Sequence, residues 1–143
     1  PGLPPDPDEA GKATIEGIDS NGNGVRDDIE RWIAVKYPNS EKTRAGLVQE
    51  ARAFQKALTS VQDTPSASAA FDEIAMGTEC LSYLVGPYQM REVDKAFLTQ
   101  MLNTSGRIRA NHAWQNLLPA VQSYSPPDGK AACIGFDPDT LPN

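Results

Sequence analysis

Residues 19–30, DSNGNGVRDDIE, constrain the fold of this chain more than any other stretch. Oxygen-bearing side chains recur at every second residue around two glycines, and this is the donor pattern of a twelve-residue calcium loop. In such a loop the first, third, fifth and twelfth residues offer side chains, the seventh offers its carbonyl, and the ninth acts through water. The sixth residue must turn sharply, and here it is Gly24. The predicted metal ligands are Asp19, Asn21, Asn23, the carbonyl of Val25, Asp27 and Glu30.

The same residues admit an alternative interpretation that needs no metal. Asn-Gly pairs favour tight turns, and acidic residues such as Asp27 and Asp28 suit the positive end of a following helix. Two observations count against this metal-free arrangement. It would place several carboxylates close together without a cation, and the stretch is not flanked by two strands that a tight turn could connect. We therefore expect Ca²⁺ to bind here, with the metal-free turn as the alternative.

The stretch resembles the EF-hand loop. It is most similar to the single loops of bacterial secreted proteins and to the thrombospondin type-3 repeat, whose pattern is DxNxNGVxDDxE. It departs from paired EF-hands at Arg26, where those proteins carry an apolar residue that joins two loops, and no second loop occurs in this sequence. The resemblance covers the loop and the helix after it, and implies a calcium ion with a structural rather than a sensory role.

The charge of the predicted ligands indicates where the protein works. Three of the ligand side chains are carboxylates, whereas Asn21 and Asn23 are neutral. Fewer charges mean weaker binding, with a dissociation constant of roughly 10⁻⁴–10⁻³ M, as in extracellular calcium modules. Such a site would not fill at cytosolic calcium concentrations, so we expect a periplasmic or extracellular protein.

The two cysteines, Cys80 and Cys133, support the same compartment. No CxxC pair or Cys/His cluster of the kind that binds zinc is present in the sequence. An even pair of cysteines in a protein with an extracellular type of calcium loop predicts a disulfide. Two free buried thiols are the alternative. A disulfide would tie the tail, which is rich in Pro, Gly and Asp, to the helix that contains Cys80.

The apolar residues predict an all-α fold, an orthogonal or up-down bundle of four to five helices. The clearest stripe is Leu47, Ala51, Phe54, Leu58 and Val61, in a helix that starts after Ser40 and runs to about residue 61. We expect a short helix at 9–17 and a longer one from residue 27 to Pro38. A third should begin at Thr64–Pro65 and end at Gly86–Pro87. Two more should follow, one from near Met90 to a break at 103–106 and one from that break to about Pro119. The last of these offers Ile108, Trp114, Leu117, Leu118 and Val121 to the core.

The chain divides into a proline-rich leader with a short lead-in, residues 1–18, and a single helical domain, residues 19–143, that begins with the calcium loop. Proline fixes the backbone and removes hydrogen-bond donors, so we expect the leader to be extended, lying on the surface or hanging free. A leader of this composition is typical both of a lipid-anchor tether and of the segment after a cleaved export signal.

Composition narrows the classes of partner. The formal net charge is −6 and the basic residues are scattered, so we do not expect nucleic-acid binding. No apolar run is long enough to span a bilayer. The hypothesis that these observations favour is a non-enzymatic, calcium-stabilised module that binds another protein, such as a periplasmic inhibitor or immunity protein.

Two other hypotheses remain. One is a hydrolase of cell-wall glycan that uses a pair of carboxylates, with candidates at Asp72, Glu73 and Glu79. The other is a purely structural envelope protein. His112, the only histidine, lies in no nucleophile motif, and we expect a structural role for it. Arg107, Arg109, Asn111 and Trp114 form either a recognition surface or, as we favour, a solvated helix face with the Trp114 ring in the core.

Overall fold

The computed structural model describes residues 2–143, and over this range the protein is all-α, with five α-helices and no β-strand. The α-helices are α1 (Asp27–Lys36), α2 (Glu41–Ser60), α3 (Thr64–Val85), α4 (Pro87–Met101) and α5 (Ser105–Gln115). Three short 3₁₀ turns, η1 (Asp8–Lys12), η2 (Gly129–Ala132) and η3 (Pro138–Thr140), lie near the chain ends. The predicted all-α class, with four to five helices, is confirmed. No helix within this range has the length and apolar character needed to cross a membrane.

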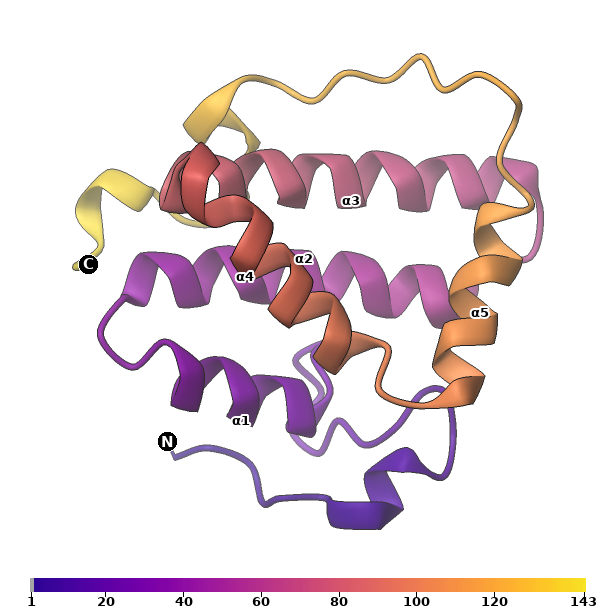
Figure 1. Cartoon of the computed structure of the whole chain (residues 1–143), viewed down its shortest axis with the longest axis horizontal. Coiled ribbons are helices and arrows are strands. Elements are labelled where there is room, and N and C mark those ends of the chain that lie inside the picture. The colour runs from indigo at the N-terminus through magenta and orange to yellow at the C-terminus, as the bar shows by residue number, and fades with distance from the viewer. Residues whose placement is uncertain (1) are drawn as a thin grey trace.

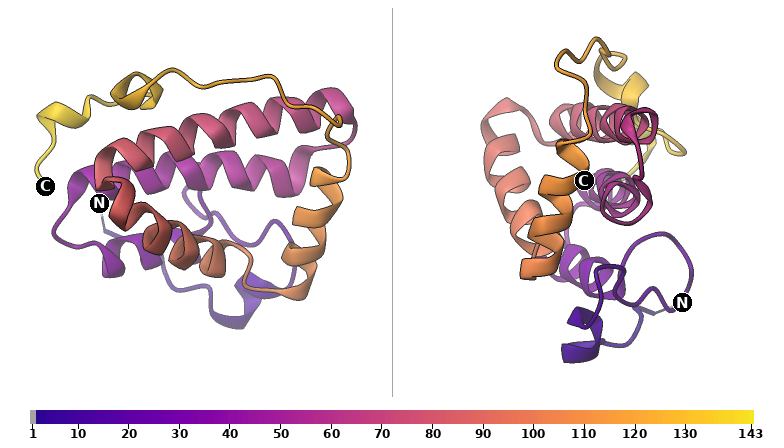
Figure 2. Two further views of the ribbon diagram at one scale, coloured as in Figure 1. Left: turned by 45° about the horizontal axis from the view of Figure 1, so that its top comes forward. Right: turned by 90° about the vertical axis from the view of Figure 1, so that its right-hand side faces the viewer.

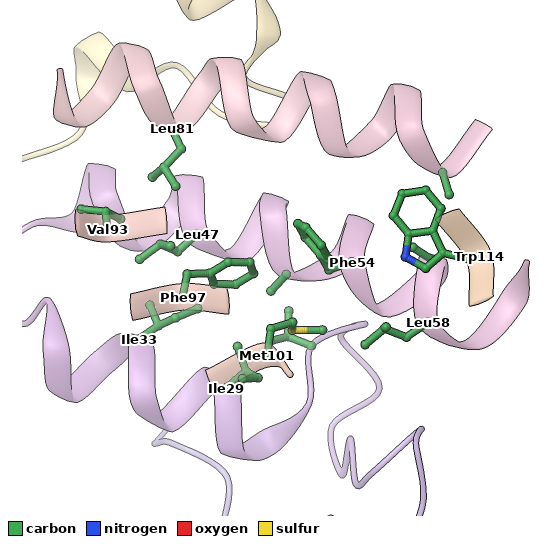
Figure 3. Close-up of a cluster of buried hydrophobic side chains, with 14 residues drawn as sticks. Ile29, Ile33, Leu47, Phe54, Leu58, Leu81, Val93, Phe97, Met101 and Trp114 are labelled. Atoms are coloured by element: carbon green, nitrogen blue, oxygen red, sulfur yellow. The ribbon is translucent and has the colours of Figure 1, made fainter. Parts of the chain in front are cut away.

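Helix α2 is the centre of the bundle, because α1, α3, α4 and α5 all contact it. Helices α2 and α3 lie side by side, α1 and α4 lie on one side of this pair, and α5 crosses its end (Figures 1 and 2). The predicted apolar stripe is buried from Leu47 to Leu58, and Val61, just after the end of α2, packs partly against the core. Phe54 packs edge-on against Phe97 of α4 with ring centroids 5.7 Å apart. Figure 3 shows these rings at the middle of the core, with Leu47, Leu81 and Met101 nearby.

The helix starts follow local capping chemistry. Helix α2 starts after Ser40, as predicted, and Ser40 caps it, since its side chain accepts a hydrogen bond from the Thr43 N–H. Helix α3 starts at Thr64, as predicted, and is capped by Asp63, which forms a reciprocal capping box with Ser66. Helix α4 starts at Pro87 rather than near Met90, because proline is tolerated in the first turn of a helix.

The end of α5 was predicted wrongly. The helix stops at Gln115, before Pro119, and the chain then leaves the bundle. Of the residues expected in its core face, Trp114 is buried and Leu118 packs partly against the core. Ile108, Leu117 and Val121 are exposed.

The C-terminal tail runs back over α3 and is fastened there (Figure 1). Cys133 forms the predicted disulfide with Cys80 of α3, with the two Cα atoms 4.8 Å apart. Gln49 of α2 holds the chain on both sides of Cys133: its amide donates to the Ala132 carbonyl and accepts from the Ile134 N–H. The tail is therefore irregular in conformation but fixed in position.

Candidate functional site

The predicted calcium loop lies on the surface between the N-terminal segment and α1. Gly24, at the sixth position, has a φ of +86°, a conformation that residues with side chains rarely adopt. The Asp19 carboxylate accepts hydrogen bonds from the Asn23 N–H at 3.2 Å and the Gly24 N–H at 2.9 Å. The loop is thus curled around its first residue.

Three of the predicted ligand side chains converge across the loop. The side-chain amides of Asn21 and Asn23 both donate to the Glu30 carboxylate, the former at 3.3 Å. Glu30 lies in the first turn of α1, so these contacts join the start of the loop to the helix that follows it. A cation bound beside the Glu30 carboxylate would need the amide oxygens of Asn21 and Asn23, so both amide groups would have to rotate by about 180°.

The remaining predicted ligands occupy different environments. Asp27 is buried, and one of its oxygens accepts from the Ser20 N–H. The Val25 carbonyl accepts no hydrogen bond from any other residue in the range 2–143, although Val25 itself is buried. A buried carbonyl that lacks a protein donor suits a cation ligand, because such groups are otherwise almost always paired.

Carboxylates alone do not make a metal site in this structure. Among residues 2–143, no three His, Cys, Asp or Glu side chains are grouped so that they could hold an ion. The predicted donor set differs in kind, since half of it consists of two neutral amides and one backbone carbonyl. The curled loop, the convergence on Glu30 and the free Val25 carbonyl fit a hard cation that takes oxygen ligands.

Behind the loop lies a polar cluster that the sequence analysis missed, formed by Arg26, Asp28, Asn103 and Arg107. Arg26, the eighth loop residue, points inward and is 1% exposed. Its guanidinium pairs with Asp28 through two hydrogen bonds, of 2.9 and 3.0 Å, and donates to the Gln100 and Met101 carbonyls at the end of α4. Arg26 thus joins the loop to the bundle, in the position where a paired EF-hand would contact its second loop.

Arg107 completes this cluster from α5. It is fully buried and donates to the carbonyls of Gly11, Thr14 and Ile15 in the N-terminal segment, and to the Asn103 side chain. These carbonyls are turned to the guanidinium rather than along a helix axis. The prediction of a short α-helix at 9–17 is therefore wrong, and only the 3₁₀ turn η1 forms in this segment.

The leader packs against the domain rather than hanging free. Besides the Arg107 contacts, Arg31 of α1 donates to the carbonyl of Pro4, which is buried. Pro1, the first residue of the predicted segment 1–18, lies outside the described residues.

The ionisation of Asp28 reflects its place in the cluster. Burial opposes the charged form, but hydrogen bonds and charge from Arg26, the Asn103 amide and the charge of Arg107 outweigh it, so the pKa of Asp28 is lowered. Asp28 is therefore an anion between two buried cations. Its charge offsets part of the positive charge of the two guanidinium groups, and the cluster holds the loop, α4 and α5 together.

A second buried carboxyl group, Glu50, lies between α2 and α3. Gly77 of α3 permits this, because a Cβ there would lie 3.2 Å from the Glu50 Cα. One Glu50 oxygen accepts from Thr78 at 2.8 Å, and the other is buried without a hydrogen-bond partner. Burial, partly offset by the Thr78 bond and reinforced by the charge of Asp94, raises the pKa of Glu50 to about 8.

The carboxylates considered for glycan hydrolysis do not form a pair with a shared cleft. Glu73 is bound to Lys56, and Glu79 accepts from the Gly129 N–H in the tail. Glu50, which has a raised pKa, lines neither of the two larger grooves of the protein. The arrangement of these groups lends no support to the hydrolase hypothesis.

The polar and aromatic residues of α5 do not form one surface. Arg107 and Trp114 are buried, and the Trp114 ring N–H donates to the Asn111 side chain at 2.9 Å. Arg109 and His112 are exposed. The Trp114 ring belongs to the core, as in the interpretation that we favoured, but Arg107 is buried and is not part of a solvated helix face.

Comparisons with known proteins place the chain in no family: no protein-family model, curated protein or solved structure matches it.

Proposed function

We propose that residues 19–30 bind one calcium ion and that the protein is a calcium-stabilised module of the periplasm or the extracellular space. The ligands would be Asp19, Asn21, Asn23, the Val25 carbonyl, Asp27 and Glu30. The observation that carries this proposal is the convergence of the Asn21 and Asn23 side chains on Glu30 around a left-handed Gly24. The ion would take the place of these amide N–H contacts to Glu30, once the two amides have turned their oxygens toward it.

The proposed role of the ion is structural. Asp27 and Glu30 both lie in the first turn of α1, and a cation bound to both would offset their negative charge. Arg26 already fixes the inner side of the loop to α4, so the outer side, from Asp19 to Asn23, is the part left for an ion to hold. The disulfide supports the proposed location, because such bonds persist in oxidising compartments.

Calcium is expected to raise the thermal stability of the protein. At ten to a hundred times the dissociation constant, a ligand of the native state adds about 1.4–2.7 kcal/mol to the free energy of unfolding. For a chain of this size that corresponds to a rise in Tm of roughly 4–8 °C. The measurement is thermal unfolding in 10 mM CaCl₂ against EDTA, for the wild type and for Glu30→Gln, which should lose the response.

The matched control for this experiment is Glu92→Gln, the same change at an exposed position of α4. It should keep the full calcium response. An equal response in Glu30→Gln and Glu92→Gln would mean that any calcium effect arises elsewhere on the acidic surface.

We further propose that the module acts by binding another protein, as an inhibitor or immunity protein does. The support is Tyr88 at the start of α4, which is 96% exposed, and the exposed Val35 of α1. Exposed tyrosines are favoured in protein interfaces, because they bury much area and lose little side-chain entropy.

The binding proposal is tested by pull-down from an envelope extract of the source organism, with wild-type protein and with Tyr88→Ser. A specific partner should be retained by the wild type and lost or reduced at least tenfold with the variant. Equal recovery by both proteins, or no specific partner at all, would count against binding through this face.

A further inference from the structure

A groove of about 510 Å³ lies between α2, α3 and residues 134–136 of the tail. This volume is within the range of small-molecule sites, roughly 300–1,000 Å³. Its apolar lining comes from Val48, Met76, Ile134 and Phe136, and its charged lining includes Arg52 and Lys56. None of the predicted calcium ligands lines it.

The tail wall of the groove is held rigidly. Ile134 follows Cys133, which is bonded to Cys80 of α3, and the Gln49 side chain holds the backbone on either side of that cysteine. Gln49 also lines the groove. A wall fixed in this way is preorganised, so a ligand would lose little free energy in ordering it.

The two cations of the groove differ in how they are paired. Lys56 is 3.1 Å from the Glu73 carboxylate, which also lines the groove. Arg52 uses its Nε to donate to the Asn23 carbonyl at 2.9 Å, while its two terminal nitrogens make no hydrogen bond or ion pair within the described chain. Arg52 is therefore the cation available to an incoming anion, and its guanidinium is held in place by the Asn23 contact.

We propose that this groove binds a small amphipathic carboxylate. The apolar chain would lie against Val48, Met76 and Phe136, and the carboxylate would take both terminal nitrogens of Arg52, the paired geometry that guanidinium groups favour. A single carboxylate suits a site with one available cation, since further negative charge would meet Glu73 and the net charge of −6. This inference goes beyond the proposed calcium function and does not depend on it.

The test is an NMR titration of ¹⁵N-labelled protein with sodium decanoate, in a buffer that contains EDTA. Saturable shifts of the Ile134 and Gly135 amides are expected, together with those of Val48 and Met76. Decanol, which has the same chain without the charge, should bind at least fivefold more weakly. Because EDTA is present, the outcome does not depend on whether the loop binds calcium.

Variants identify the charge that matters. Arg52→Gln should weaken decanoate binding at least fivefold, whereas Arg91→Gln, the same change at an exposed position on α4, should leave it unchanged. Shifts that fail to saturate, shifts centred away from the groove, equal affinity for decanol, or equal weakening by the two variants would each overturn the proposal.

Discussion

Replacement of Arg107 by methionine is expected to lower the free energy of unfolding by about 3–5 kcal/mol, the largest effect of any single substitution considered. Arg107 is fully buried and is the shared donor for three backbone carbonyls and the Asn103 side chain. Methionine can fill much of the space but can donate to none of these groups. The buried Gly11 carbonyl would be left without a partner, or the N-terminal segment would detach so that water could reach it.

Two measurements test this prediction. Denaturant unfolding should show the loss of stability, and limited proteolysis should show faster cleavage within residues 8–17. The matched control is Arg109→Met on the same helix, because Arg109 is exposed. Its effect should be within about 0.5 kcal/mol of zero. Equal stability of the two variants would show that the cluster does not hold the N-terminal segment to the bundle.

The second large effect expected is a loss of stability at alkaline pH that depends on Glu50. Burial raises the pKa of Glu50 from 4.5 to about 8 in the folded protein. The folded state therefore binds a proton that the unfolded state releases, and stability falls as the pH rises from 4.5 through 8. Since one pKa unit corresponds to about 1.4 kcal/mol, the fall should be on the order of 4 kcal/mol between pH 5 and pH 9.

Glu50→Gln should remove most of this dependence. Glutamine keeps the acceptor for Thr78 and cannot ionise. A smaller slope of the same sign should persist, because burial also raises the pKa of Asp94. Urea midpoints measured from pH 5 to pH 9 give the comparison, with Glu73→Gln as the exposed control. If Glu50→Gln kept the wild-type slope, the Glu50 carboxyl group would not be the source of the dependence.

The parts of the fold that sequence predicts well are those set by neighbouring residues. The stripe from Leu47 to Leu58, the Ser40 cap and the all-α class depend on helical periodicity and on local hydrogen bonds. The pairing of Cys80 with Cys133 followed from the number of cysteines and the expected compartment. None of these required knowledge of what lies across the bundle.

The buried charges are the parts that sequence analysis missed. Arg26, Glu50 and Arg107 belong to residue types that are usually solvated, and their burial depends on partners far along the chain. A signal was nevertheless present for two of them. Glu50 lies at helical spacing between Leu47 and Phe54, and Arg107 lies seven residues before the buried Trp114 on α5. A charged residue on an apolar helix face indicates a buried polar contact.

The candidate site shows the same division. The structure joins the Asn21 and Asn23 side chains to Glu30, three of the residues that sequence spacing grouped together, while calcium binding itself stays a prediction. The spacing of residues in the loop could not predict that Arg26 would bind the end of α4, because that contact joins residues about seventy-five positions apart in the chain. The contacts of Arg26 with the end of α4 hold this single loop in place, where a paired EF-hand would use its second loop.

The most direct test of the calcium proposal is a crystal structure grown in millimolar CaCl₂, with diffraction recorded at a long wavelength to detect anomalous scattering from calcium. We expect one strong peak within the loop, at about 2.3–2.6 Å from the Glu30 carboxylate and the Val25 carbonyl. A map with well-defined density for residues 19–30 but no anomalous peak among them would contradict the proposal.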